Sequence, residues 1–124
     1  MIIRQNGLQV AASLRHAIDG IRRVILVQRD GTAFSDDGPE HDRDRLGALV
    51  VHCLEMAHHT AAGAELHGLA TCVVRTDEGA VLVTPVGDRF ALAVVVEPQV
   101  NLVLLQRAIT PQVEHLLALD GAVA

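Results

Sequence analysis

The chain has almost no aromatic residues, and this scarcity excludes several kinds of binding. Its 124 residues include two phenylalanines but no tryptophan or tyrosine. Base stacking and anchoring at a membrane interface both depend on aromatic rings. Basic clusters are also missing, and the formal net charge is −5, whereas phosphate-backbone binding needs clustered lysine and arginine. We therefore expect neither a nucleic-acid partner nor insertion into a membrane.

Long apolar runs and a disulfide framework are missing as well. The longest apolar runs, such as 91–96, are far shorter than the roughly 20 residues of a membrane-spanning helix. The N-terminal residues do not resemble a secretory signal or a transit peptide, so we expect a cytoplasmic protein. Two cysteines, Cys53 and Cys72, each have apolar neighbours. We interpret both as buried thiols that do not form a disulfide.

Apolar runs and short turns predict five strands. The segment 69–96 contains three apolar runs separated by the short breaks DEG and GD, which is typical of a three-stranded antiparallel meander. Earlier in the chain, apolar runs at 21–28 and 32–35 flank Arg29-Asp30-Gly31. Asp and Gly tolerate the backbone angles of a tight turn, so this segment predicts a first hairpin.

Three segments show helical spacing. The first begins near Asn6 and stops at Gly20, and the second runs from Asp42 or Asp44 to about 63–66. The third begins near Leu102, and we expect it to continue through Pro111 with a kink. The chain is thus predicted to form a single domain, 1–124, of the α+β class. Its order is helix, two strands, helix, three strands, helix, with a five-stranded antiparallel sheet and helices on both faces.

The long second helix has an apolar surface wider than one core-facing stripe. One stripe includes Leu46, Leu49 and Cys53, and a second includes Val50 and Leu54. Because one side can cover the sheet, the other needs a partner, and we expect a dimer. Small residues would let a second helix approach closely: Gly47, Ala57, Ala61, Ala62, Gly63 and Ala64.

No pattern of catalytic residues is recognisable. Ser13 and Ser35 have no nucleophile-elbow motif, no glycine-rich phosphate loop follows a strand, and we expect neither an enzyme nor a cofactor. The same helix carries His52, Glu55 and His59 on one face. This set could contribute to a metal site, which leaves a metal-binding or small-molecule sensor as an alternative function. The simpler interpretation is a solvated polar face.

Two segments of the chain resemble a known family. Residues 20–31, GIRRVILVQRDG, are similar to the first hairpin of the Roadblock/LC7 domain, and VLVTPVGD at 81–88 with ALAV at 91–94 is similar to its fourth and fifth strands. The predicted order of elements fits the same family along nearly the whole chain. Members have a profilin-like layered fold and are not NTPases.

The resemblance implies a homodimer that regulates or scaffolds a small Ras-like GTPase, as bacterial members of the family do. Such dimers form through the long helix and the third strand. An activating partner can also supply an arginine to the GTPase, and Arg29 and Arg89 lie at turns, although we expect solvated polar groups there. Transferred by position, the implied dimer interface comprises Val50, Leu54, Ala57, Ala61, Ala70, Cys72 and Val74.

Overall fold

The computed structural model describes residues 1–121 and confirms the predicted order of helices and strands. The elements are α1 (Arg4–Ala17), β1 (Ile21–Gln28), β2 (Ala33–Asp36), the 3-10 helix η1 (Glu40–Asp42), α2 (Arg43–Gly63), β3 (Cys72–Thr76), β4 (Gly79–Val86), β5 (Phe90–Val96) and α3 (Leu102–Gly121). None of the helices within this described part has the length and apolar character needed to cross a membrane.

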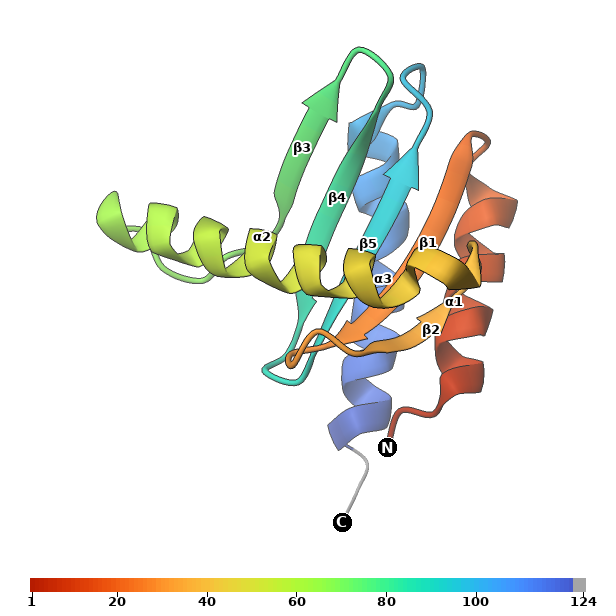
Figure 1. Ribbon diagram of the computed structural model, residues 1–124, viewed down its shortest axis with the longest axis horizontal. Helices are drawn as coiled ribbons and strands as arrows, with labels where there is room; N and C mark the ends of the chain where they lie inside the picture. Colours follow the sequence, from red (N-terminus) through yellow and green to blue (C-terminus); the bar gives the residue numbers. More distant parts are fainter. Residues whose placement is uncertain (122–124) are drawn as a thin grey trace.

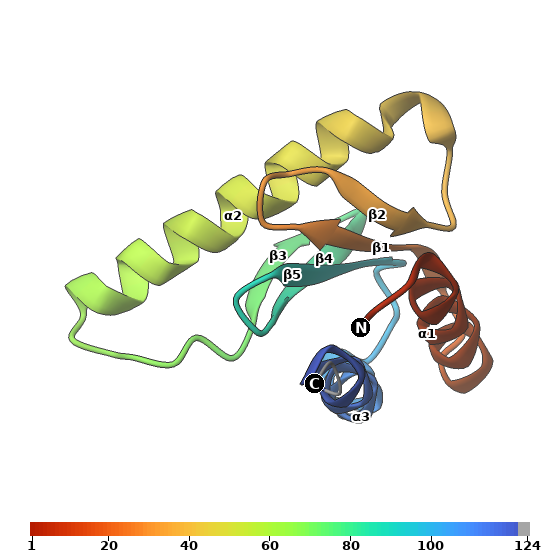
Figure 2. The same ribbon diagram turned by 90° about the horizontal axis from the view of Figure 1, so that it is seen from below.

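The five strands form one antiparallel sheet in the order β2-β1-β5-β4-β3. Helix α2 lies across one face, and α1 and α3 lie on the other (Figure 1, Figure 2). The fold is therefore a three-layer α+β arrangement. It leaves β2 and β3 as the two edges, and within residues 1–121 β3 pairs only with β4.

Each face of the sheet has its own apolar core. On β1, Val24 and Leu26 pack on the side of α1 and α3, whereas Ile25 and Val27 pack under α2. Side chains alternate between the two faces of a strand, and both faces are covered here. This explains why four consecutive residues of β1 are apolar.

One helix start differs from the sequence prediction, and another agrees with it. Helix α1 begins at Arg4, before Asn6, and the Asn6 Oδ1 atom accepts a hydrogen bond from the Ile3 N–H at 2.7 Å. Helix α3 starts after Asn101, whose Oδ1 accepts from the backbone N–H groups of the first turn. Asparagine is a favoured N-cap residue. Helix α3 continues through Pro111, as the sequence predicts.

Strand β3 is shorter than predicted. It begins at Cys72 instead of Leu69, and Cys72 pairs with Val83. One residue earlier, the Thr71 hydroxyl donates to the Val83 carbonyl at 3.2 Å. In the same register Ala70 would oppose Pro85, which has no N–H to donate to a ladder. These two features end the pairing although the apolar pattern continues.

Candidate functional site

The edge strand β3 exposes apolar side chains on both of its faces. Val73 and Val74 are 43% and 46% exposed, and the outer edge of the strand has no neighbouring strand among residues 1–121. Unpaired backbone groups on an edge strand are ready to pair with another chain. The strand contains one charged residue, Arg75, and no proline. It therefore has few of the features that usually prevent such pairing.

The outward face of α2 is also partly apolar. Leu49 and Met56 are 51% and 53% exposed, and their spacing of seven residues places them on the same side of the helix. Figure 1 shows the C-terminal part of α2 extending past β3, beyond the edge of the sheet. Single exposed apolar residues are common. Here they lie on the helix that crosses the edge strand β3 (Figure 1), and we call these four exposed residues (Leu49, Met56, Val73 and Val74) the α2–β3 surface.

The structure corrects the predicted orientation of α2. Val50 and Leu54, which the sequence prediction placed in the dimer interface, are only 3% and 0% exposed. Both belong to the core between α2 and the sheet, so neither can contact a partner in this fold. Ala57 and Ala61 are half-buried, and Ala70 is exposed but precedes β3.

The remaining predicted interface residues, Cys72 and Val74, do lie on β3. Cys72 is half-buried and Val74 is exposed. The sequence prediction did not include the exposed residues Met56 and Val73, and it placed Leu49 on the other stripe. The two apolar stripes of α2 were both plausible core faces, and only the contacts with the sheet distinguish them.

Gly47 was predicted to allow the approach of a second helix, and this prediction was also wrong. It is buried against the first hairpin of its own chain, where a Cβ atom would lie 2.4 Å from the Gly31 carbonyl oxygen. The absence of a side chain at Gly47 thus lets α2 lie close to the β1–β2 turn.

A buried ion pair fixes the corner through which the chain enters α2. The Arg23 guanidinium donates from Nε to Asp36 Oδ1 at 2.9 Å and from Nη1 to Asp42 Oδ1 at 2.9 Å. It also donates to the Pro39 carbonyl. Arg43, at the start of α2, contacts Asp36 at 3.3 Å. Strand β1, the end of β2 and the start of α2 are therefore held by one polar network.

The network shifts the pKa of its central carboxylate. Burial alone raises the pKa of Asp36, but hydrogen bonds from Arg23 and the Gly38 N–H, together with the charge of Arg23, lower it more. The net result is a pKa below the ordinary value for aspartate. The pKa of Arg23 is raised, chiefly by its hydrogen bonds to Asp36. Both groups therefore stay charged at neutral pH.

The predicted metal ligands do not form a metal site. Among residues 1–121 no group of three or more histidine, cysteine, aspartate or glutamate side chains is placed to hold an ion. His52, Glu55 and His59 are all exposed on α2. Since they share one helix, a further ligand would have to come from an element facing them.

The two turn arginines differ in their surroundings. Arg29 donates from Nε to the Phe90 carbonyl at 3.1 Å and from Nη2 to the Gly87 carbonyl at 2.7 Å. It thereby joins the β1–β2 turn to the β4–β5 turn. Arg89 is largely exposed and forms a 3.3 Å ion pair with Asp120. Of the two, Arg89 is the better placed to reach another molecule.

A recess of about 290 Å³ lies between β4 and α3. Its lining includes Thr84, Pro85, Ile109 and Val113 together with the exposed residues Gln106 and Glu114. Because exposed polar side chains form part of its wall, the recess is open to solvent. Small-molecule sites combine a mostly apolar, enclosing lining with a few precisely placed polar groups, and this recess is not enclosed.

A protein-family model, described as Roadblock/LC7 domain, matches residues 6–96. No curated protein matches the chain closely enough in sequence to count as a relative. Solved structures are similar in fold at low sequence identity. A Roadblock/LC7 domain from Streptomyces avermitilis has a TM-score of 0.79 at 18% identity, over 86% of this chain and 91% of that one.

Two further structures extend the likeness of fold. MglB from Myxococcus xanthus has a TM-score of 0.82 at 16% identity, over 97% of this chain and 95% of that one. Profilin II from Acanthamoeba castellanii has a TM-score of 0.62 at 11% identity, over 90% and 95% of the two chains. The similarity to profilin II confirms the profilin-like layering that was predicted from the sequence.

Proposed function

Because the chain belongs to the Roadblock/LC7 family, a family of regulatory protein-interaction domains, we propose that it forms a homodimer which regulates or scaffolds a small Ras-like GTPase in the cytoplasm. The family match and the fold similarity to MglB support the regulatory role. The observation that carries the homodimer is the α2–β3 surface, where exposed apolar residues of α2 are combined with an apolar strand whose outer edge has no neighbouring strand among residues 1–121.

In a dimer whose two-fold axis lies beside β3, both the strand and the helix parts of this surface would contact the second copy. Pairing of the two β3 strands would join the two sheets and give the edge backbone groups their hydrogen-bond partners. The projecting part of α2 would then pack against the α2 helix of the second copy. Leu49 and Met56, instead of the buried Val50 and Leu54, would contact the partner.

The chain has no catalytic role of its own in this proposal. GTPase partners contain the nucleotide-binding residues, and a regulator acts by stabilising one nucleotide state or by ordering the catalytic residues of the GTPase. Arg89 is exposed enough to contribute directly, whereas the guanidinium of Arg29 is occupied by two backbone carbonyls.

The test uses purified small Ras-like GTPases from the same organism, each loaded with GTP or with GDP. We expect one of them to form a complex whose affinity differs between the two nucleotide states, with GTP hydrolysis either accelerated or unchanged. Acceleration would identify an activator, and an unchanged rate would identify a scaffold. Equal affinity for both states, or no complex with any GTPase, would contradict the proposal.

Arg89→Ala separates a contributed arginine from an indirect mechanism. If Arg89 contacts the nucleotide, the variant should bind the GTPase but lose most of the acceleration, because arginine contributions to phosphoryl transfer are large. Arg107→Ala, an exposed arginine on α3, is the matched control. Equal acceleration by both variants would exclude Arg89 from the mechanism.

The alternative function, a small-molecule or metal-binding sensor, has less support. For a metal sensor, no set of metal ligands is placed together within residues 1–121. A small-molecule sensor would depend on the open recess between β4 and α3.

A further inference from the structure

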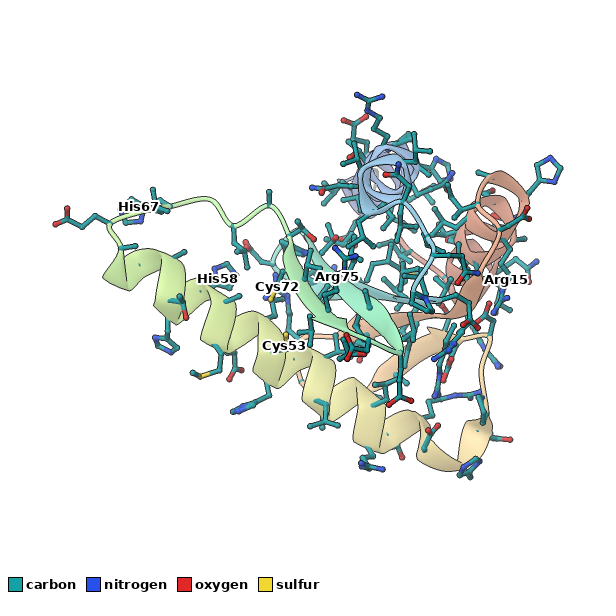
Figure 3. All side chains as sticks on the ribbon, turned by 90° about the horizontal axis from the view of Figure 1, so that it is seen from above. Arg15, Cys53, His58, His67, Cys72 and Arg75 are labelled. Carbon is teal, nitrogen blue, oxygen red and sulfur yellow. The ribbon has the colours of Figure 1, made fainter. Side chains whose placement is uncertain are left out.

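The two cysteines of the chain are in contact. Cys53 lies in the middle of α2 and Cys72 is the first residue of β3, and their Sγ atoms are 3.7 Å apart. Figure 3 shows both side chains between the helix and the strand. Each residue is a free cysteine and is half-buried, so the two thiols are less covered than the buried thiols predicted from the sequence.

The surroundings of the pair restrict what the thiols can do. The side chains pack against the apolar core beneath α2, and neither takes part in an ion pair or a metal site among the described residues. Burial raises the pKa of the Cys53 thiol, and the neighbouring Cys72 raises it further. Cys53 is therefore expected to remain a protonated thiol until a reactive sulfur forms beside it.

We propose that Cys53 and Cys72 are a redox-sensitive pair that forms a reversible disulfide between α2 and β3. A disulfide has an S–S distance of about 2.05 Å, so the sulfur atoms must approach from their present separation of 3.7 Å. Residues 64–71, which connect the two elements, lie outside any helix or strand. In this proposal, a small displacement of this connecting segment and of the start of β3 brings the sulfur atoms together.

Hydrogen peroxide is the simplest oxidant for this step. The Cys72 thiol gives up its proton and its sulfur attacks one peroxide oxygen. The O–O bond breaks, the departing hydroxide takes up that proton as water, and a sulfenic acid remains. The Cys53 sulfur then attacks the sulfenic sulfur, its S–H proton leaves, and water departs as the S–S bond forms. In sum, the two thiols lose two protons and two electrons, which together are two hydrogen atoms, and one peroxide becomes two waters. A dithiol reductant reverses the reaction.

The bond would close a ring that contains the C-terminal part of α2 and the segment 64–71. A cross-link stabilises a protein chiefly by restricting its unfolded chain, and this one would also fix α2 relative to β3. The oxidised form should thus hold the α2–β3 surface in a single arrangement. The proposal rests on the contact between the sulfur atoms and does not depend on the identity of a GTPase partner.

The experiment oxidises the reduced, folded protein with a small excess of hydrogen peroxide at micromolar protein concentration. We expect the intact mass to fall by two hydrogen atoms and both titratable thiols to disappear. The product should remain a single chain on a non-reducing denaturing gel. The melting temperature should rise by roughly 5–10 °C, as expected for a ring of this size, and should return to its original value after addition of dithiothreitol.

Cys53→Ser and Cys72→Ser serve as matched controls. Each keeps one thiol and a side chain of similar size, and its folding is checked by circular dichroism before oxidation. Neither should show the mass loss or the rise in melting temperature. The proposal fails if the wild-type chain gains oxygen atoms or joins a second chain instead of losing two hydrogens. It also fails if the single-cysteine variants show the same thermal shift.

Discussion

The side chain of Asp36 has no exposed surface, yet it carries a charge at the corner between β2 and α2. Arg23, itself 9% exposed, neutralises it, and Arg43 and the Gly38 N–H complete its hydrogen bonds. Removing one partner of a buried ion pair leaves the other charge without compensation. The stability of this corner should therefore depend strongly on each partner.

Asp36→Asn should lower the free energy of unfolding at neutral pH by about 3–5 kcal/mol. Urea-induced unfolding followed by circular dichroism measures this loss. The exposed pair Arg22–Glu97 provides the control, because Glu97→Gln should have a much smaller effect. Equal losses for the two variants would show that burial does not determine the importance of the Arg23–Asp36 pair.

The lowered pKa of Asp36 predicts how the free energy of unfolding changes as the pH falls. Because the pKa of Asp36 is lower in the folded chain than in the unfolded chain, its contribution is complete above the ordinary aspartate pKa of about 3.9. The contribution is lost as pH falls from there through the folded-state pKa. Wild-type protein should therefore lose more stability than Asp36→Asn across this range. If the free energies of unfolding of the two proteins fell equally with pH, the contribution assigned to Asp36 would be contradicted.

At the scale of elements, the contact between α2 and the first hairpin depends on Gly47. Gly47→Ala should destabilise the fold by about 1–3 kcal/mol, because the added methyl group would meet the Gly31 carbonyl. Alanine is otherwise the better helix former by about 1 kcal/mol. Gly63→Ala tests that effect alone, since a Cβ at Gly63 meets no atom within 4 Å. Thermal unfolding should shift downward for Gly47→Ala and slightly upward for Gly63→Ala.

The element order could be predicted from the sequence because its signals are local. Apolar runs and Asp/Gly turns define the hairpins, and helical spacing defines the three helices. The face that each helix presents to the sheet could not be predicted in the same way. On α2 both Leu49 and Val50 are apolar, and only the packing under the helix buries Val50 and exposes Leu49.

Contacts between distant segments were also beyond prediction from the sequence. Cys53 and Cys72 meet because α2 crosses the sheet above β3, and the ion pair of Arg23 with Asp36 depends on the β1–β2 register. A single sequence gives no signal for such pairs. The end of β3 at Cys72 likewise depends on how Thr71 bonds across the strand pair.

At the scale of the whole molecule, the proposed homodimer should weaken in acid. His52 and His59 are exposed on the outward side of α2, where the same helix also carries the exposed charged residues Asp44, Arg45 and Glu55. Histidine side chains ordinarily gain positive charge as pH falls from about 8 to about 5. If the α2 helices of two copies pack together, these charges should repel, and the dissociation constant should rise.

A double variant, His52→Gln with His59→Gln, isolates this effect. Its dissociation constant should vary less with pH than that of the wild type, as measured by sedimentation velocity. A wild-type dissociation constant that stays constant over the same pH range would place both histidines away from the dimer axis.

Sedimentation equilibrium of the wild type beside Met56→Glu and Leu104→Glu tests the α2–β3 surface most directly. Met56 and Leu104 are 53% and 50% exposed, the first on α2 and the second on α3. The account predicts a dimer for the wild type and for Leu104→Glu, and a dissociation constant raised at least about tenfold for Met56→Glu, which corresponds to about 1.4 kcal/mol. A monomeric wild type, or a dimer that Leu104→Glu weakens and Met56→Glu does not, would contradict it.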